Sequence, residues 1–154
     1  MRYDEDDGYH SEYTLRFPRK PIESEEPRDL GGVKCTSTQA KCIYDGAVFV
    51  FEQTRTFSLV QFKTTDLMQV VADQAGGKLG NSRQIHHLGL EAVQSEIRGI
   101  DGVVGYVAVF EYEGIYTVMA VFGISDSSAF DTFIGGFRPS DRYIAVNYRE
   151  ARGD

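Results

Sequence analysis

In three segments of this chain both alternating sets of residues are mostly apolar, and this pattern constrains the fold more than any other feature. The segments are Ala47–Phe51, Val104–Phe110 and Ile115–Phe122. Successive side chains of a β-strand point to opposite faces of its sheet, so strands of this kind are buried on both faces. The middle of the predicted sheet must therefore be covered on both sides.

Strand-like runs separated by only a few turn residues predict hairpins, and hence an antiparallel sheet. The clearest turn is Tyr44-Asp45-Gly46, because Gly46 can adopt the positive φ that a tight hairpin turn requires. Two strands, Ser82–Leu88 and Ala92–Arg98, are more polar, so we expect them to be more exposed to solvent or nearer an edge of the sheet. The other predicted strands are Tyr13–Phe17, Val33–Ile43, Ala47–Thr56, Val104–Tyr112 and Ile115–Phe122.

Two segments have the apolar periodicity of a helix that packs one side against a sheet. The first is Thr64–Leu79, with an apolar residue at every fourth position, and the second is Ser127–Phe137. The spacing in the second predicts that Phe133 and Phe137 are both buried against the sheet. With these helices covering the two faces, the predicted fold class is α+β, an α/β/α sandwich around an antiparallel sheet of about six to seven strands.

The predicted organisation is one domain, residues 13–138, between two extensions. Residues 1–12 carry an acidic run, and repulsion between like charges predicts a flexible N-terminus. The stretch 18–32, with its Glu, Pro and Gly residues, is predicted to be a loop. The C-terminal extension, 139–154, contains the strand-like run Tyr143–Tyr148, which we expect to pair with an edge of its own sheet or, failing that, with a second chain.

The acidic charge balance limits the classes of partner. The formal net charge is -7 and the pI is about 5.0, which argues against nucleic acid and against an anionic membrane surface. No stretch approaches the roughly 18 apolar residues of a membrane span. Met1–Gly8 lacks the apolar region of a secretory signal. The chain is thus expected in the cytoplasm, or as the mature part of an exported or lipid-anchored envelope protein.

Few side chains are candidates for catalysis or for metal binding. His86 and His87, near Glu91, are the best candidates for a metal or acid–base site, but neighbours on a strand point to opposite faces. Cys35 and Cys42 are seven residues apart, an odd spacing that also predicts opposite faces and therefore two free thiols, unless the strand bulges between them. We expect no catalytic, cofactor-binding or metal-binding residues.

Two further motifs carry little weight. Gly76–Gly80 is similar to a phosphate-binding loop, but it closes a predicted helix, whereas a phosphate loop opens one. The terminal Arg152-Gly153-Asp154 matches an adhesion tripeptide, and three residues often match by chance.

Several short motifs together resemble a family of small bacterial domains. The chain opens on an F-P-x-x-P start, Phe17-Pro18-Arg19-Lys20-Pro21, and a strand pair with a Gly-containing turn follows the first helix at His87–Ala92. A Y-x-x-x-A strand, Tyr116–Ala120, and a helix that ends in Phe133–Phe137 come last, although Gly replaces the usual polar residue between these two Phe. In this order the motifs resemble the PsbP/Mog-like fold, which includes the DcrB-type envelope lipoproteins.

The resemblance implies a domain without enzymatic activity. Its members mostly serve as extrinsic subunits of a membrane complex, as binders of a small GTPase, or as chaperone-like and envelope proteins of unknown role. They share no functional residue that could be carried over. We therefore expect an accessory domain, monomeric or dimeric, that engages another protein through a sheet edge or loops. Two alternatives are a carrier of a small apolar ligand, suggested by ten Phe and nine Tyr residues, and an enzyme with an unrecognised carboxylate or histidine site.

Overall fold

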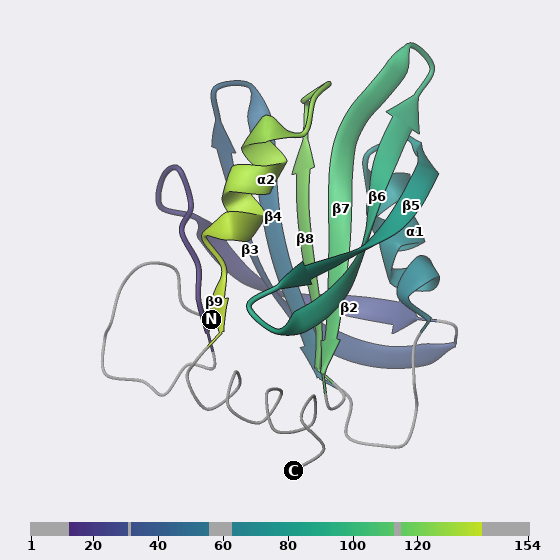
Figure 1. Cartoon of the computed structure of the whole chain (residues 1–154). Helices are drawn as coiled ribbons and strands as arrows, with labels where there is room; N and C mark the ends of the chain where they lie inside the picture. The colour runs from purple at the N-terminus through teal and green to yellow at the C-terminus, as the bar shows by residue number, and fades with distance from the viewer. Residues whose placement is uncertain (1–12, 31, 56–62, 113–114, 140–154) are drawn as a thin grey trace.

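The computed structural model describes residues 13–30, 32–55, 63–112 and 115–139, and its main feature is an antiparallel sheet of seven strands (Figure 1). Its strands follow the spatial order β2-β3-β4-β8-β7-β6-β5, and a separate two-stranded ladder joins β1 to β9. The strands are β1 Tyr13–Thr14, β2 Ile22–Leu30, β3 Val33–Tyr44, β4 Ala47–Arg55, β5 Lys78–His87, β6 Leu90–Gly99, β7 Gly102–Tyr112, β8 Ile115–Phe122 and β9 Arg138–Pro139. The helices are α1 Thr64–Gln74 and α2 Ser128–Gly135.

Two hairpins of the sheet are closed by tight turns with positive φ at both central residues. The β3–β4 turn has φ of 52° at Asp45 and 78° at Gly46, which confirms the turn predicted there. The β5–β6 turn has φ of 51° at Leu88 and 82° at Gly89. Such turns match the twist of the strands that they join, so they hold the register of each hairpin.

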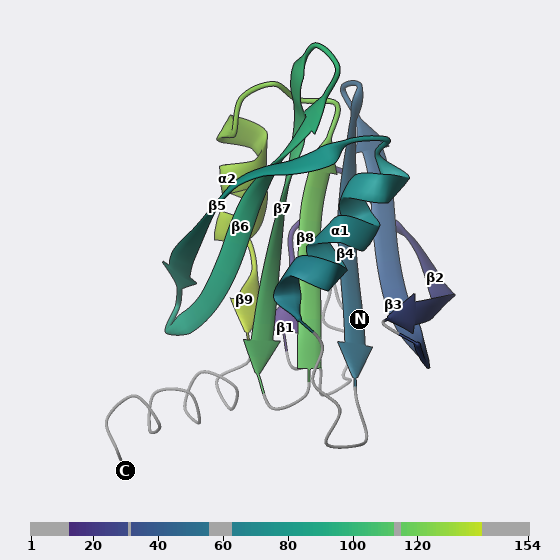
Figure 2. The same ribbon diagram turned by 90° about the vertical axis from the view of Figure 1, so that its right-hand side faces the viewer.

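The middle of the sheet is buried on both faces, as the apolar pattern predicts. Four successive residues of β7, Val107 to Phe110, are each at most 1% exposed. Val107 and Val109 belong to the cluster under α1, whereas Ala108 and Phe110 belong to the cluster under α2. The two helices accordingly lie on opposite sides of the central strands (Figure 2).

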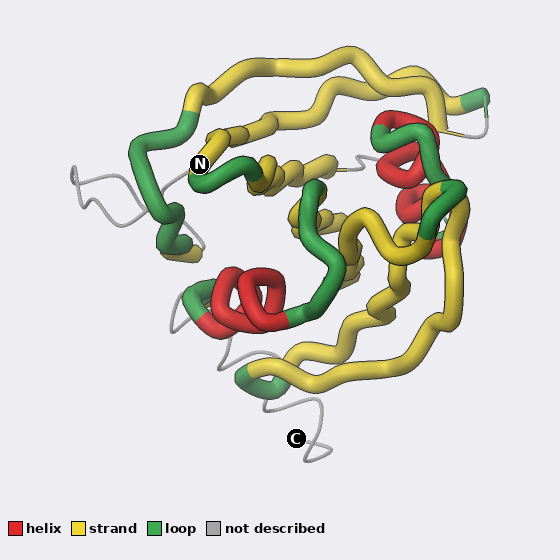
Figure 3. Tube along the Cα trace, turned by 90° about the horizontal axis from the view of Figure 1, so that it is seen from above, coloured by secondary structure: helices red, strands yellow, loops and turns green. Residues whose placement is uncertain are grey.

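The predicted α/β/α sandwich is wrong, because the chain is mostly β-structure. α1 has 11 residues and α2 has 8, and neither forms a layer over a seven-stranded sheet. Part of the cover on the α2 side comes instead from the curvature of the sheet, whose β5–β6 end curls around as seen from above (Figure 3). Twist and coiling of strands thus bury surface that the sequence pattern assigned to helices.

The loop expected over residues 18–32 is also wrong. Ile22–Leu30 forms β2, which pairs with β3 at one edge of the sheet. Its glutamates and Pro27 favour a loop when the segment is considered alone. An edge strand tolerates them, because one side of it is not committed to the ladder of hydrogen bonds.

The first helix ends at Gln74 rather than at the expected Leu79. Gly76 adopts a φ of +70°, and the backbone N–H of Gly77 donates to the carbonyl of Ala72 over 2.9 Å. This is the Schellman pattern, which satisfies carbonyls that a helix end leaves unpaired. The chain then enters β5 directly.

The structure confirms one of the remaining predictions, and the others concern residues that it does not describe. Phe133 and Phe137 are 3% and 1% exposed, so their predicted burial is confirmed, although Phe137 lies just beyond the end of α2. The acidic residues 1–12, the run Tyr143–Tyr148 and the terminal Arg152-Gly153-Asp154 lie outside the described residues. Neither described helix is long and apolar enough to cross a membrane.

Candidate functional site

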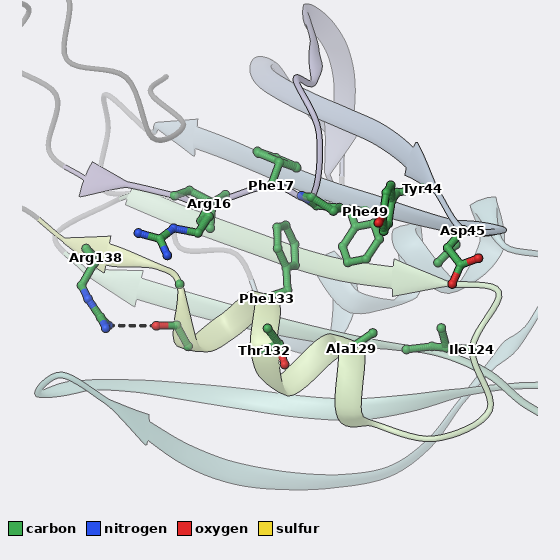
Figure 4. Close-up of a pocket in the computed structure, with 15 residues that line it drawn as sticks. Arg16, Phe17, Tyr44, Asp45, Phe49, Ile124, Ala129, Thr132, Phe133 and Arg138 are labelled. Carbon is green, nitrogen blue, oxygen red and sulfur yellow. Dashed lines mark hydrogen bonds between the residues drawn. The ribbon is translucent and has the colours of Figure 1, made fainter.

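A pocket of about 670 Å³ lies between α2, the segment that follows β1 and the β3–β4 turn (Figure 4). Hollows of roughly 300–1,000 Å³ are the usual size for small-molecule sites in proteins. The size of this one makes it the first candidate for a binding site.

Three phenylalanine rings form the apolar wall of this pocket. The ring centroid of Phe133 lies 5.3 Å from that of Phe17 and 5.4 Å from that of Phe49. The Phe49–Phe133 pair meets edge-on at 78°, an arrangement that the charge distribution of aromatic rings favours. Phe49 and Phe133 are buried, whereas Phe17 is only partly buried. The wall is therefore anchored in the core on one side and reaches solvent at Phe17.

Each wall residue is positioned by a different part of the chain. Phe49 lies on β4, where every second side chain faces α2. Phe133 belongs to the buried stripe of α2. Phe17 belongs to the segment after β1, which is anchored by Leu15, a residue only 1% exposed. The pocket exists only where these distant segments meet.

The two ends of the pocket differ in charge. Arg16 and Arg138 line one end, and Tyr44 and Asp45 line the other (Figure 4). Arg19 also lies beside the Tyr44 end, with its guanidinium carbon 5.6 Å from the centre of the tyrosine ring. Two arginines thus line the end away from Asp45, and a third lies near the Asp45 end.

The backbone places both arginines at the same end of the pocket. β1 pairs with β9 so that Thr14 lies opposite Arg138, which brings the start of the described chain to the segment after α2. A Cβ added at Gly136 would lie 3.3 Å from the Cβ of Arg16, so the absence of a side chain allows this close approach. The Nη1 atom of Arg138 also donates to the carbonyl of Gly135 over 2.9 Å. Backbone pairing and this bond together orient the cationic end.

The structure separates the histidines that the sequence singled out. His86 is exposed and lies opposite Glu91 on the neighbouring strand. His87 turns to the other face, where its Nε2 is 2.6 Å from the carbonyl oxygen of Phe137 and its ring stacks on that of Phe137 at 20°. Among the described residues, no group of three or more His, Cys, Asp or Glu is placed to hold a metal ion.

The remaining candidates have structural explanations. The glycines after α1 end the helix, and a Cβ added at Gly77 would lie 2.8 Å from the carbonyl oxygen of Arg98. Cys35 and Cys42 are free thiols in the clusters of opposite faces, which confirms the spacing argument. Burial raises the pKa of both thiols, so both stay in the weakly nucleophilic neutral form.

A polar cluster on the α1 side of β2, β3 and β4 is absent from the sequence predictions. Arg28 forms a two-point ion pair with Glu52, with Nε–Oε2 and Nη2–Oε1 distances of 2.9 and 2.6 Å. Gln39 donates to the same carboxylate over 3.0 Å, and the two charged side chains are each 14% exposed. The cluster ties the edge strand to the sheet, and it could not be foreseen while residues 18–32 were assigned to a loop.

Arg16 and Arg138 are the pocket residues that sequence reasoning missed. Arg16 directly precedes the recognised Phe17-Pro18 motif, but no local pattern connects it to a residue more than a hundred positions away. Comparisons with protein-family models, with curated proteins and with solved structures give no match for this chain. The resemblance to the PsbP/Mog-like fold stays a prediction from its motifs.

Proposed function

We propose that this chain is a non-catalytic binding domain that takes a small, largely apolar molecule into the pocket between α2 and the sheet. The observation that carries the proposal is the wall of Phe17, Phe49 and Phe133 in a hollow of about 670 Å³. Small-molecule sites are typically concave and lined mainly by apolar and aromatic side chains, with a few polar groups that orient the ligand. The lining of this pocket supports a role of that kind.

A second role, docking of another protein at a sheet edge, has a weaker basis. Within the described residues β2 pairs with β3 and β5 pairs with β6, so each has one side outside the sheet. However, β2 carries Pro27 and charged side chains such as Glu23 and Glu25. Proline and edge charges are the features with which proteins discourage the addition of a strand. We therefore place ligand binding first.

Filling the pocket tests the proposed function. Thr132 lines the pocket and is exposed, so Thr132→Trp should occupy the space without disturbing the core. We expect the neutral fluorophore N-phenyl-1-naphthylamine to gain emission with the natural chain, and its affinity to fall about tenfold or more in the variant. The matched control is Thr65→Trp, an exposed threonine of α1 on the other face.

The two variants must first show similar melting temperatures. Binding that falls in Thr132→Trp but not in Thr65→Trp supports the pocket as the site. Equal binding by both variants, or no binding by the natural chain, contradicts the proposed function.

A further inference from the structure

The α1 face of the sheet carries exposed apolar side chains beyond the end of its helix. α1 has 11 residues and spans about 16 Å, and the sheet extends past it toward the β3–β4 turn (Figure 2). Ile43 lies directly opposite Val48, and Ile22 lies opposite Lys41, which itself lies opposite Val50. Val48 and Val50 pack in the cluster under α1, so both isoleucines are on this face, where Ile22 is 79% and Ile43 61% exposed.

These isoleucines adjoin a continuous apolar row rather than standing alone. The strand register sets Ile43, Val48 and Phe122 side by side across β3, β4 and β8. Val48 and Phe122 are only partly buried, and together with Val104 they line the hollow of about 340 Å³ beside the end of α1. Contiguous exposed apolar surface of this kind is typical of protein interaction sites.

One cation accompanies the apolar row. Among the described residues that line the hollow, Lys41 alone is charged; it is exposed, and no carboxylate in the described part of the chain forms an ion pair with it. Glu52, on the same side of β4, is already paired with Arg28, and Asp73 accepts a bond within α1. Asp45 lines the pocket on the other face. The surface therefore complements a partner that has a carboxylate next to apolar side chains.

The shape of the surface favours a helix as the partner element. The row crosses strands whose backbones are already paired on both sides, so it offers side chains and no free edge. Three strand spacings of about 4.8 Å, roughly 14 Å in all, separate β3 from β7, and a helix of about ten residues has that length. An amphipathic helix presents apolar residues at i, i+4 and i+7 along such a line.

The charges argue against two other occupants. A two-fold contact between copies of this chain would bring two Lys41 side chains to one interface, and like charges repel. An anionic membrane surface would be repelled by the chain as a whole, whose net charge is -7.

We infer that this surface, formed by Ile22, Ile43, Val48, Phe122 and Lys41, docks an amphipathic helix of a partner protein. The helix sets apolar side chains on the row and a carboxylate on Lys41. The inference goes beyond the proposed function, because the pocket for the small molecule lies on the opposite face of the sheet.

Helix-constrained peptides displayed on phage, with randomised surface positions, are selected on the natural chain, and the enriched peptides are titrated by fluorescence anisotropy. We expect them to combine an apolar stripe with an acidic residue. Their affinity should fall about tenfold or more in Ile22→Ser/Ile43→Ser, which alters only exposed side chains. Lys41→Glu should instead prefer the same peptide with lysine in place of its acidic residue, a reversal that misfolding could not produce.

Two variants serve as matched controls and should bind like the natural chain. Leu88→Ser removes an exposed leucine from the β5–β6 turn, and Lys34→Glu reverses an exposed lysine of β3 that does not line the hollow. The inference is overturned if no peptide is enriched, if the enriched peptides lack an acidic residue, or if their binding survives in Ile22→Ser/Ile43→Ser. A natural chain that is dimeric by light scattering and monomeric in that double variant assigns the surface to a second copy and overturns it equally.

Discussion

The two faces of the sheet are closed in different ways. On one face, α1 sets Leu67, Met68 and Val71 against mainly aliphatic side chains of the central strands. On the other, α2 sets Phe130 and Phe133 against a surface that contains several more aromatic rings. The hollow on the α1 face measures about 340 Å³ and has Gln39, Lys41 and Gln74 in its lining, whereas that on the α2 face measures about 670 Å³ and has the phenylalanine wall.

Helix length and ring shape explain this difference. With 8 residues, α2 spans about 12 Å, whereas β8, also of 8 residues, spans about 26 Å, so the helix covers only part of the strands beneath it. The rings of Phe17, Phe49 and Phe133 meet tilted or edge-on beside it. A pocket therefore forms where the short helix gives way to the segment that contains Phe17.

The largest expected effect comes from the packed part of the α2 face. Phe137 contacts the rings of Phe51 and Phe110 at centroid distances of 6.0 and 5.3 Å, and it is 1% exposed. Phe137→Ala should lower the free energy of unfolding by about 3–5 kcal/mol in urea titrations. Phe17→Ala, at the open side of the pocket, should cost clearly less, because its ring is only partly buried. Similar losses in both variants would show that the face is packed uniformly.

The next effect tests how the edge strand is held on the α1 side. Glu52→Ala leaves Arg28 partly buried without its carboxylate, so we expect a loss of about 1–3 kcal/mol in the free energy of unfolding. The double variant Arg28→Met/Glu52→Leu should recover much of that loss, because it removes both charges and keeps the volume. If the double variant is as unstable as Glu52→Ala, the pair itself stabilises β2, contrary to this expectation.

Substituting alanine at two glycines should change the free energy of unfolding in opposite directions. Gly77→Ala places a methyl group 2.8 Å from the Arg98 carbonyl oxygen and the Ile97 side chain, and should cost about 1–3 kcal/mol in thermal or urea unfolding. Gly135→Ala meets no atom within 4 Å and lies in α2, so it should stabilise the chain by about 0.5–1 kcal/mol. A destabilising Gly135→Ala would mean that the end of α2 is more tightly packed than the pocket suggests.

The smallest effect concerns the start of each helix. Neither N-cap residue, Lys63 of α1 or Ser127 of α2, makes a side-chain cap hydrogen bond. Before α2, however, Asp126 accepts bonds from the hydroxyl and the backbone N–H of Ser128, and these lower the pKa of its carboxyl below the ordinary value of 3.8. A lowered folded-state pKa adds stability above the ordinary value, and that stability is lost as the pH falls through the folded-state value. The natural chain should therefore melt slightly above Asp126→Asn at neutral pH, and the gap should close in acid below 3.8. A gap that is independent of pH would exclude the charge of Asp126 as its cause.

Local signals sufficed for much of the sheet and for part of the site. The turn at Asp45-Gly46 depends only on the backbone freedom of adjacent residues, and the double burial of β7 and β8 follows from runs of apolar residues within single strands. The burial of Phe133 in the candidate site was likewise predictable, because the spacing of apolar residues on a helix marks its inner face.

Long-range contacts decided the rest. β2 is a strand because its backbone pairs with β3 and its Arg28 forms an ion pair with Glu52. The residues of Ile22–Leu30 by themselves predict neither interaction. The curvature of the sheet, which replaces the expected helical layers, is a sum of small twists over seven strands. Arg16 and Arg138 line the same end of the pocket because β1 pairs with β9. Sequence alone determined which residues seek burial or a turn, whereas the tertiary structure decided which distant residues share a surface, because that depends on how the whole chain closes.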